Sequence, residues 1–140
     1  MTGFAKTALQ CAIAVAVLVP ILAGAAGMMA GPAMMGLDHA VASDLDSHYR
    51  YLSGLLLGIG LAFAASIPNI ERNGRRIRLL AGIVVIGGAG RLYAVFLAGH
   101  ASRTTMLALA MELLVTPGLA LWQHRLERRP PSFEGRWAGN

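Results

Sequence analysis

Charged residues are scarce in this 140-residue chain, and it has one cysteine. Charged residues make up 14% of the sequence and hydrophobic residues 56%, a balance that excludes an ordinary soluble domain. The lone Cys11 excludes an intrachain disulfide and a dithiol redox pair. The composition therefore indicates a membrane protein.

Several chemical signatures are missing as well. The sequence contains no nucleophile motif, no phosphate-binding glycine loop and no paired-carboxylate acid/base arrangement. None of the four histidines lies deep in an apolar run, which argues against paired ligation of a haem inside the membrane. We therefore expect no cofactor and no metal, and an enzyme is the weaker hypothesis.

Long apolar runs dominate what is present. A helix needs about 20 predominantly apolar residues to cross a bilayer, far more than a strand requires. The chain offers four such windows, at 8–30, 49–68, 77–99 and 104–122. We predict an all-α fold of four transmembrane helices in an antiparallel bundle. This single domain would cover residues 1–128, followed by a short flexible cytoplasmic tail at 129–140.

The charges predict the orientation of these spans. The net charge is +5, but the basic residues flank apolar runs instead of alternating with aromatics on a solvent face, so nucleic acid is not an expected partner. The loop before the second span carries Asp38, Asp44 and Asp46 with only Arg50 nearby. The positive-inside rule then places both termini in the cytoplasm. Nine basic residues fall on that side: Lys6, Arg72, Arg75, Arg76, Arg78, Arg125, Arg128, Arg129 and Arg136.

A cleaved signal peptide is the alternative for the first span. Lys6, the apolar run and Ala23-Gly24-Ala25 imitate the three parts of such a peptide. The run continues to Ala30, however, which is longer than a signal peptide needs and favours a retained helix. Cleavage would leave three spans.

Small residues recur at four-residue spacing in three spans. Between apolar helices in lipid, close packing drives association, so these stripes predict the helix faces that meet protein. Internal packing is the simpler interpretation, and homodimerisation through one stripe stays open. We also expect Pro20 and Pro117 to kink their helices. The stripes are Ala23, Gly27 and Gly31; Gly54, Gly58, Ala62 and Ser66; and Gly87, Gly90, Ala94 and Ala98.

Two charges lie inside the third and fourth spans. Arg91 and Glu112 are equally far from the middle of the short loop that joins these spans, so an antiparallel hairpin places them at the same depth. That depth is roughly 12 to 16 Å below the outer surface at 1.5 Å per residue. Because a lone charge there costs a few kcal/mol, we predict a buried Arg91–Glu112 ion pair. It would fix the hairpin register or form a ligand site.

A second polar cluster precedes and begins the second span at the outer mouth. Its main members are Asp46, His48 and Arg50, with Asp38, His39 and Asp44 close in sequence and His100 as a further neighbour. The spacings match no closed metal site. Capping of the second helix by Asp44 or Asp46, and an Asp46–Arg50 pair one helical turn apart, explain the cluster more simply.

Several segments in order resemble a known family. They are Asp46-Ser47-His48-Tyr49-Arg50-Tyr51-Leu52-Ser53-Gly54, Glu71-Arg72-Asn73-Gly74-Arg75, Gly88-Ala89-Gly90-Arg91-Leu92 and Glu112-Leu113. Together they are similar to the small bacterial integral-membrane proteins grouped as domain of unknown function 4345. The resemblance implies four helices in a bacterial inner membrane, as a multi-pass protein, and it implies no activity, substrate or catalytic residue.

Three functions stay open. The first is a non-enzymatic accessory or structural membrane component, whose partners are the lipid bilayer and other membrane subunits or a second copy. The second is a small transporter or ligand-binding membrane protein that uses Arg91 and Glu112. Small multidrug transporters also have four helices, but they carry their essential glutamate in the first helix, where this sequence has none. The third is a membrane enzyme acting through His48 and the aspartates.

Overall fold

A computed structural model describes residues 3–36 and 42–127 of the chain. This part is helical, with no strand. The predicted tail at 129–140 lies outside the described residues. The elements in order are α1 (Gly3–Ala30), the 3₁₀ helix η1 (Gly31–Met35), α2 (Ser43–Ala64), α3 (Gly74–Ala98), α4 (Arg103–Ala110), the π-helix η2 (Met111–Val115) and α5 (Thr116–Glu127).

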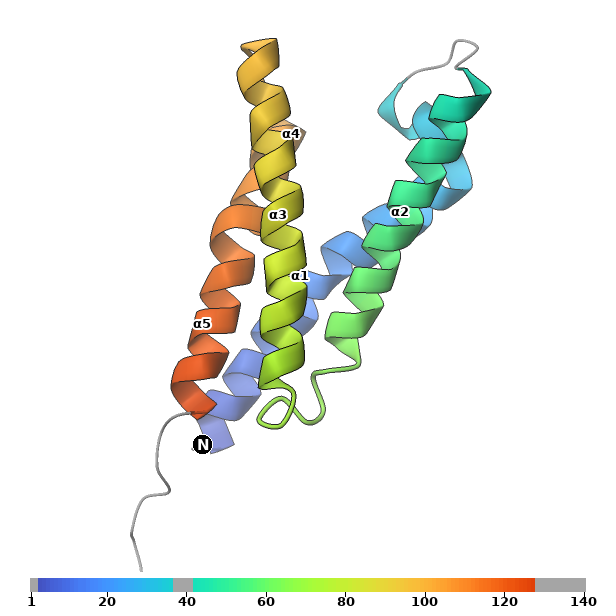
Figure 1. The fold of residues 1–140 in the computed structure, drawn as a ribbon. Helices are drawn as coiled ribbons and strands as arrows, with labels where there is room; N and C mark the ends of the chain where they lie inside the picture. Colours follow the sequence, from blue (N-terminus) through green and yellow to red (C-terminus); the bar gives the residue numbers. More distant parts are fainter. Residues whose placement is uncertain (1–2, 37–41, 128–140) are drawn as a thin grey trace, which may run out of the picture.

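The helices form two antiparallel pairs. α1 packs along α2, and α3 packs along the continuous run of α4, η2 and α5. Figure 1 shows the two pairs close together where α1 begins and diverging toward the opposite end. We call the first the basal end, formed by the start of α1, residues 65–73 and the end of α5. The second, formed by η1, the start of α2 and residues 99–102, is the distal end.

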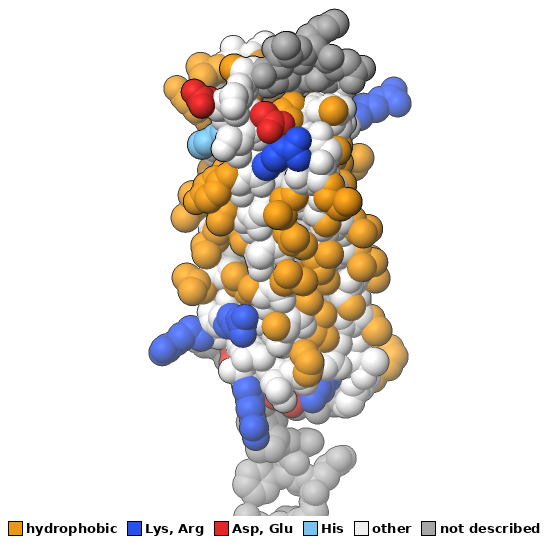
Figure 2. Space-filling view, turned by 90° about the vertical axis from the view of Figure 1, so that its right-hand side faces the viewer, with side chains coloured by type: hydrophobic (Ala, Val, Ile, Leu, Met, Phe, Trp, Pro, Cys, Tyr) orange, Lys and Arg blue, Asp and Glu red, His pale blue; other side chains and the backbone are white. Residues whose placement is uncertain are grey.

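Three helical segments are long and apolar enough to cross a membrane: Gly3–Met35, Gly74–Ala98 and Arg103–Glu127. They correspond to the first, third and fourth predicted spans. α2 is not among them, because its first two turns carry Asp44, Asp46, His48 and Arg50. It also ends at Ala64, short of the predicted Pro68. Figure 2 shows one face with apolar side chains across the middle and charged side chains gathered at both ends.

The buried core lies in the basal half. Ile70 in the loop between α2 and α3 is fully buried and packs against residues of α1, α3 and α5. Burial of a side chain of this size is worth roughly 1.5 to 3 kcal/mol. The two pairs are thus joined at one end. The core cluster consists of Leu9, Ile13, Val17, Ile70, Ile77, Ala81, Ala120 and Leu126.

Two glutamines from different helices fasten the 65–73 loop. Gln10 of α1 donates to the carbonyl oxygen of Ile67 at 2.9 Å, and Gln123 of α5 donates to that of Ile70 at 3.1 Å. Within the loop, Asn73 Nδ2 donates to the Ser66 carbonyl oxygen at 3.3 Å. These bonds satisfy carbonyls that lie outside any helix, as a buried backbone requires.

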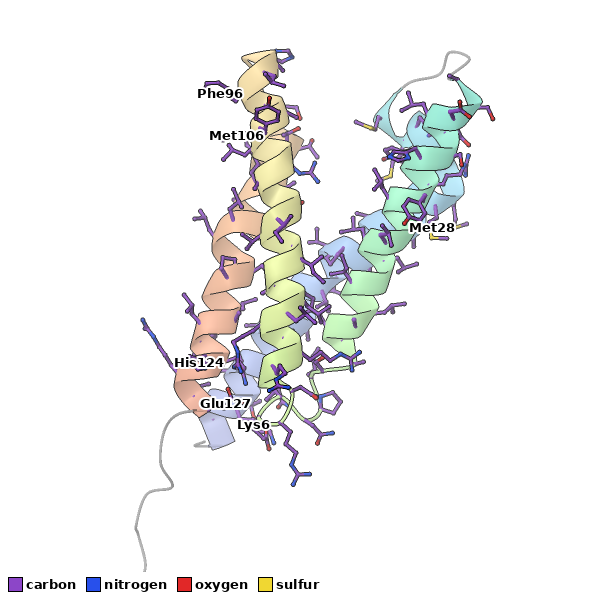
Figure 3. The ribbon with its side chains drawn as sticks, in the orientation of Figure 1. Lys6, Met28, Phe96, Met106, His124 and Glu127 are labelled. Atoms are coloured by element: carbon purple, nitrogen blue, oxygen red, sulfur yellow. The ribbon has the colours of Figure 1, made fainter. Side chains whose placement is uncertain are left out.

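Ion pairs surround this loop. Lys6 Nζ lies 2.7 Å from Glu71 Oε1, and Arg78 Nη1 lies 2.9 Å from Glu127 Oε2. His124 Nδ1 lies 3.3 Å from Arg78 Nη1. Figure 3 shows Lys6, His124 and Glu127 together at the basal end. The pairs connect α1 to the loop and α3 to α5.

The predicted small-residue stripes are confirmed in part: Gly27, Gly31 and Gly54 face a neighbouring helix, whereas other members do not. A Cβ on Gly58, Gly87 or Gly90 would meet nothing within 4 Å. The close approaches use other glycines: a Cβ on Gly24 would lie 2.6 Å from the Leu57 backbone nitrogen, and one on Gly88 would lie 2.8 Å from Leu113 Cδ2. Spacing alone marks several helix faces, and only the packing of neighbouring side chains selects one. Gly27 and Gly31 do face α2, as predicted.

The helix backbone differs around the two prolines. α1 passes through Pro20 as one helix. Pro117 follows η2, where the backbone N–H and the side-chain hydroxyl of Thr116 both bond to the Met111 carbonyl oxygen. A proline lacks the N–H that would bond the residue four positions back, and its ring crowds that carbonyl. We attribute the wider π-turn around Leu113 to this crowding.

Replacement of Gly24 by alanine should destabilise the α1–α2 pair. The new methyl group would meet the α2 backbone, which cannot move without separating the helices, at a cost of roughly 1 to 3 kcal/mol. The matched control is Gly58→Ala, which enters open space and should be neutral or slightly stabilising. The measurement is thermal unfolding in mild detergent. Equal melting temperatures for the two variants would contradict the packing.

The Lys6–Glu71 pair predicts a dependence of stability on acid pH. The hydrogen bond from Lys6, followed by one from the backbone N–H of Glu71, lowers the pKa of the Glu71 carboxyl. A lowered folded-state pKa contributes stability that is complete above the unfolded value of about 4.3 and is lost as the pH falls through the folded value.

The acid-side loss of stability should therefore be shallower in Glu71→Gln than in the unaltered protein. Melting temperatures between about pH 6 and pH 3 measure it. Arg103→Gln serves as the control, since Arg103 begins α4 at the distal end, away from this pair. If Glu71→Gln and the unaltered protein lose stability in parallel, the pair does not contribute.

Candidate functional site

Arg91 and Glu112 meet across α3 and η2. Arg91 Nε donates to Glu112 Oε2 and Nη2 donates to Oε1, both at 3.0 Å. This two-bond arrangement between a guanidinium and a carboxylate is the strong, geometrically specific form of such a pair. The structure thus brings together two residues that are 21 positions apart in sequence.

Local features on both helices place the pair. Gly88, one turn before Arg91, is buried against Glu112 and Leu113, so α3 approaches η2 closely there. Glu112 lies in the π-turn, whose extra residue rotates the following side chains relative to a regular helix. Ser102 begins α4 by accepting a hydrogen bond from the Thr105 backbone N–H at 3.1 Å. This cap and the tight 99–102 turn set the register between the two helices.

The pair is less covered by protein than the sequence predicted. The Arg91 side chain is 44% exposed and that of Glu112 is 19% exposed. The sequence predicted that other helices would bury both side chains, and for Arg91 this prediction is wrong. The reason is that α1 and α2 diverge from α3 toward the distal end and leave this level uncovered. Arg91 lies seven residues before the end of α3, roughly 11 Å along the helix.

A shallow open groove of about 390 Å³ reaches Arg91 along the distal part of α3 and the start of α4. Small side chains of α3 make the groove, and hydroxyl and imidazole groups of the 99–102 turn and α4 provide polar atoms. Among its lining residues are Arg91, Ala94, Ala98, His100, Ser102 and Thr105. The groove connects the ion pair to the distal surface.

The Asp46–Arg50 pair joins the start of α2 to the end of α1 at the distal end. Arg50 Nε lies 2.9 Å from Asp46 Oδ2, and Arg50 Nη1 donates to the carbonyl oxygens of Met28 and Met29 at 2.7 and 2.9 Å. A cation at a helix C-terminus is favourable because the last carbonyls lack helical partners. Gly31, with φ of +62°, turns the chain directly beneath this pair, where a Cβ would lie 2.6 Å from both side chains.

The remaining members of the predicted outer cluster do not join this pair. Neither Asp44 nor Asp46 caps α2 through its side chain, because the first residue before the helix is Ala42. The His48 ring lies 6.4 Å from that of Tyr51, and His100 lies on the other helix pair, bonded to the Ala98 carbonyl oxygen. Asp38 and His39 lie outside the described residues. Among residues 3–36 and 42–127, no three His, Cys, Asp or Glu side chains could share a metal ion.

Sequence reasoning missed the residues that close the basal end. Gln10, Gln123 and Ile70 are not among the candidate residues that the sequence predicts. A signal for both glutamines was present: an uncharged polar side chain within an apolar helix favours a partner inside the protein. For Ile70 the sequence offered none, since an isoleucine in a short polar loop does not reveal what it packs against.

A family model described as domain of unknown function (DUF4345) matches residues 8–123. That range includes the basal core except Leu126, the 65–73 loop, Arg50, Arg91 and Glu112. No curated protein and no solved structure matches the chain.

Removal of both members of the Arg91–Glu112 pair should lower the free energy of unfolding by less than the sum of the two single removals, because each single change leaves one charge without its partner. Arg91→Leu, Glu112→Leu and the double variant form a cycle whose coupling free energy we expect at roughly 0.5 to 3 kcal/mol. Thermal unfolding in detergent or lipid nanodiscs measures it. A parallel cycle on the exposed Lys6–Glu71 pair should give less than about 1 kcal/mol. Additive single changes at Arg91 and Glu112 would remove the energetic basis of the pair.

Proposed function

The chain belongs to the DUF4345 family, and on that premise we propose that it is a non-enzymatic accessory or structural component of a bacterial inner membrane. It would cross that membrane four times with both termini in the cytoplasm. The observation that carries this proposal is the distal half of α3, α4 and η2, which α1 and α2 leave uncovered and where the Arg91 side chain is 44% exposed.

The path of the chain supports four crossings. α1 and α3 both begin at the basal end, so α2 must return from the distal end to the basal end between them. With 22 residues, α2 extends about 33 Å, but its apolar part, residues 51–64, extends only about 21 Å, so the bilayer would thin around it. Its polar first turns would lie in the distal interface. Since the basal end carries most arginines, the positive-inside rule supports a cytoplasmic basal end.

An accessory role follows from the cost of leaving the ion pair in lipid. A charged side chain well inside a bilayer is unfavourable by a few kcal/mol and normally faces protein or water. Large apolar side chains also cover the distal half of α3, and Phe96 and Tyr93 are 82% and 65% exposed. Figure 3 places Phe96 near the distal end of α3. Another membrane subunit or a second copy packed on the distal half would cover the exposed part of Arg91.

Site-specific photo-crosslinking tests this role. A photoreactive amino acid at Phe96 should give a defined crosslinked product in cells that express the protein at its native level. The same amino acid at Val15 of α1, 67% exposed in the basal half, is the matched control and should give none. Copurification in mild detergent then identifies the partner. Identical diffuse products at both positions would contradict a distal protein interface.

The groove beside Arg91 favours a second candidate, a small ligand-binding or transport protein. Arginine would bind an anionic group of a small or amphiphilic molecule, and Glu112 would bind or release a proton. Native mass spectrometry of the purified protein should then show a bound molecule that Arg91→Leu loses and Arg103→Leu retains. A lone particle without any such mass would exclude this candidate.

A further inference from the structure

Within residues 3–36 and 42–127, the basal end presents four arginines that form no salt bridge with a carboxylate. Within the described ranges, its two carboxylates, Glu71 and Glu127, are paired with Lys6 and Arg78. The remaining four arginines are exposed and make no ion pair or side-chain hydrogen bond in this part of the chain. They are Arg72, Arg75, Arg76 and Arg125.

Three of these arginines lie on a firmly held part of the backbone. Arg72 is in the loop that Ile70 anchors in the core, and its backbone N–H bonds to the Asn69 carbonyl oxygen at 2.9 Å. Arg75 and Arg76 are in the first turn of α3, directly after the buried Gly74. A held backbone reduces the conformational entropy lost when the side chains bind a common target.

Exposed apolar side chains continue from the arginines along the same helix faces. Leu79, 66% exposed, is four residues after Arg75 on α3, and Trp122, 37% exposed, is three residues before Arg125 on α5. Residues at these spacings are neighbours on a helix surface. Each helix therefore presents a charge at the basal end and apolar surface about one turn deeper. A phospholipid has the same order, with a headgroup phosphate above acyl chains.

We propose that Arg72, Arg75, Arg76 and Arg125 bind the headgroup phosphates of anionic phospholipids at the membrane surface. The planar guanidinium can donate two hydrogen bonds to one phosphate, and clusters of basic residues beside a membrane helix attract anionic lipids. Orientation of the spans requires only that positive charge be present during insertion. After insertion, the four arginines remain beside apolar helix faces without an ion pair in the described part of the chain, and they can therefore bind lipid. This lipid site is independent of the distal interface proposed above.

The test compares anionic with zwitterionic lipid. Detergent-solubilised protein is titrated with phosphatidylglycerol or phosphatidylcholine, and binding is followed by native mass spectrometry and by melting temperature. We expect Arg72→Gln/Arg75→Gln/Arg76→Gln to weaken phosphatidylglycerol binding roughly 100-fold and to leave phosphatidylcholine binding unchanged. Arg103→Gln at the distal end is the control and should change neither.

Salt adds a test that needs no variant. Between about 0.1 and 1 M salt the screening length falls from about 10 to 3 Å, so phosphatidylglycerol binding by the unaltered protein should decrease. Equal affinity for the two lipids, or binding insensitive to salt, overturns the proposal even if the triple variant fails to fold. A melting-temperature increase with soluble glycerol 3-phosphate equal to that with phosphatidylglycerol would assign the arginines to a free phosphate and likewise overturn it.

Discussion

Burial of Ile70 between the two helix pairs is the contact on which the arrangement of the other elements depends. It draws the 65–73 loop into the space between α1, α3 and α5, where Gln10 and Gln123 bond its carbonyl oxygens. Without Ile70, the two pairs would be joined only by the direct contacts of α1 with α5 and of α2 with α3. The divergence of the pairs toward the distal end follows, since the buried core lies in the basal half.

Polar side chains provide tertiary contacts here that apolar side chains cannot provide in lipid. Because lipid tails are as apolar as leucine, burial of a lipid-facing side chain against another helix gains little, unlike burial of the loop residue Ile70, whereas a hydrogen bond to an otherwise unpaired carbonyl gains more. Gln10, Gln123 and Arg50 all act in this way, each donating to a carbonyl oxygen in another element. Close approach at Gly24 and Gly88 supplies the remaining van der Waals contact.

The two ends of the molecule therefore differ physically. The basal end is closed by a packed loop, hydrogen bonds and ion pairs, and it carries arginines on a firm backbone that form no ion pair in the described part of the chain. The distal half has the Arg91–Glu112 pair and its groove, with 44% of the Arg91 side chain exposed. In the proposed topology, a firm basal end and an incompletely covered distal half suit a protein that functions beside lipid and a second component.

The sequence by itself determined the helical class, three helices long and apolar enough to cross a membrane, and the matching level of Arg91 and Glu112 in their hairpin. Those features follow from hydrophobic length, charge placement and a short connecting loop, all of which act locally along the chain. The tertiary structure decided which glycines meet a neighbour, how far α2 extends, what covers the ion pair and where Ile70 lies. Several helix faces have small residues at the right spacing, and only the side chains of another element, distant in sequence, determine which face packs.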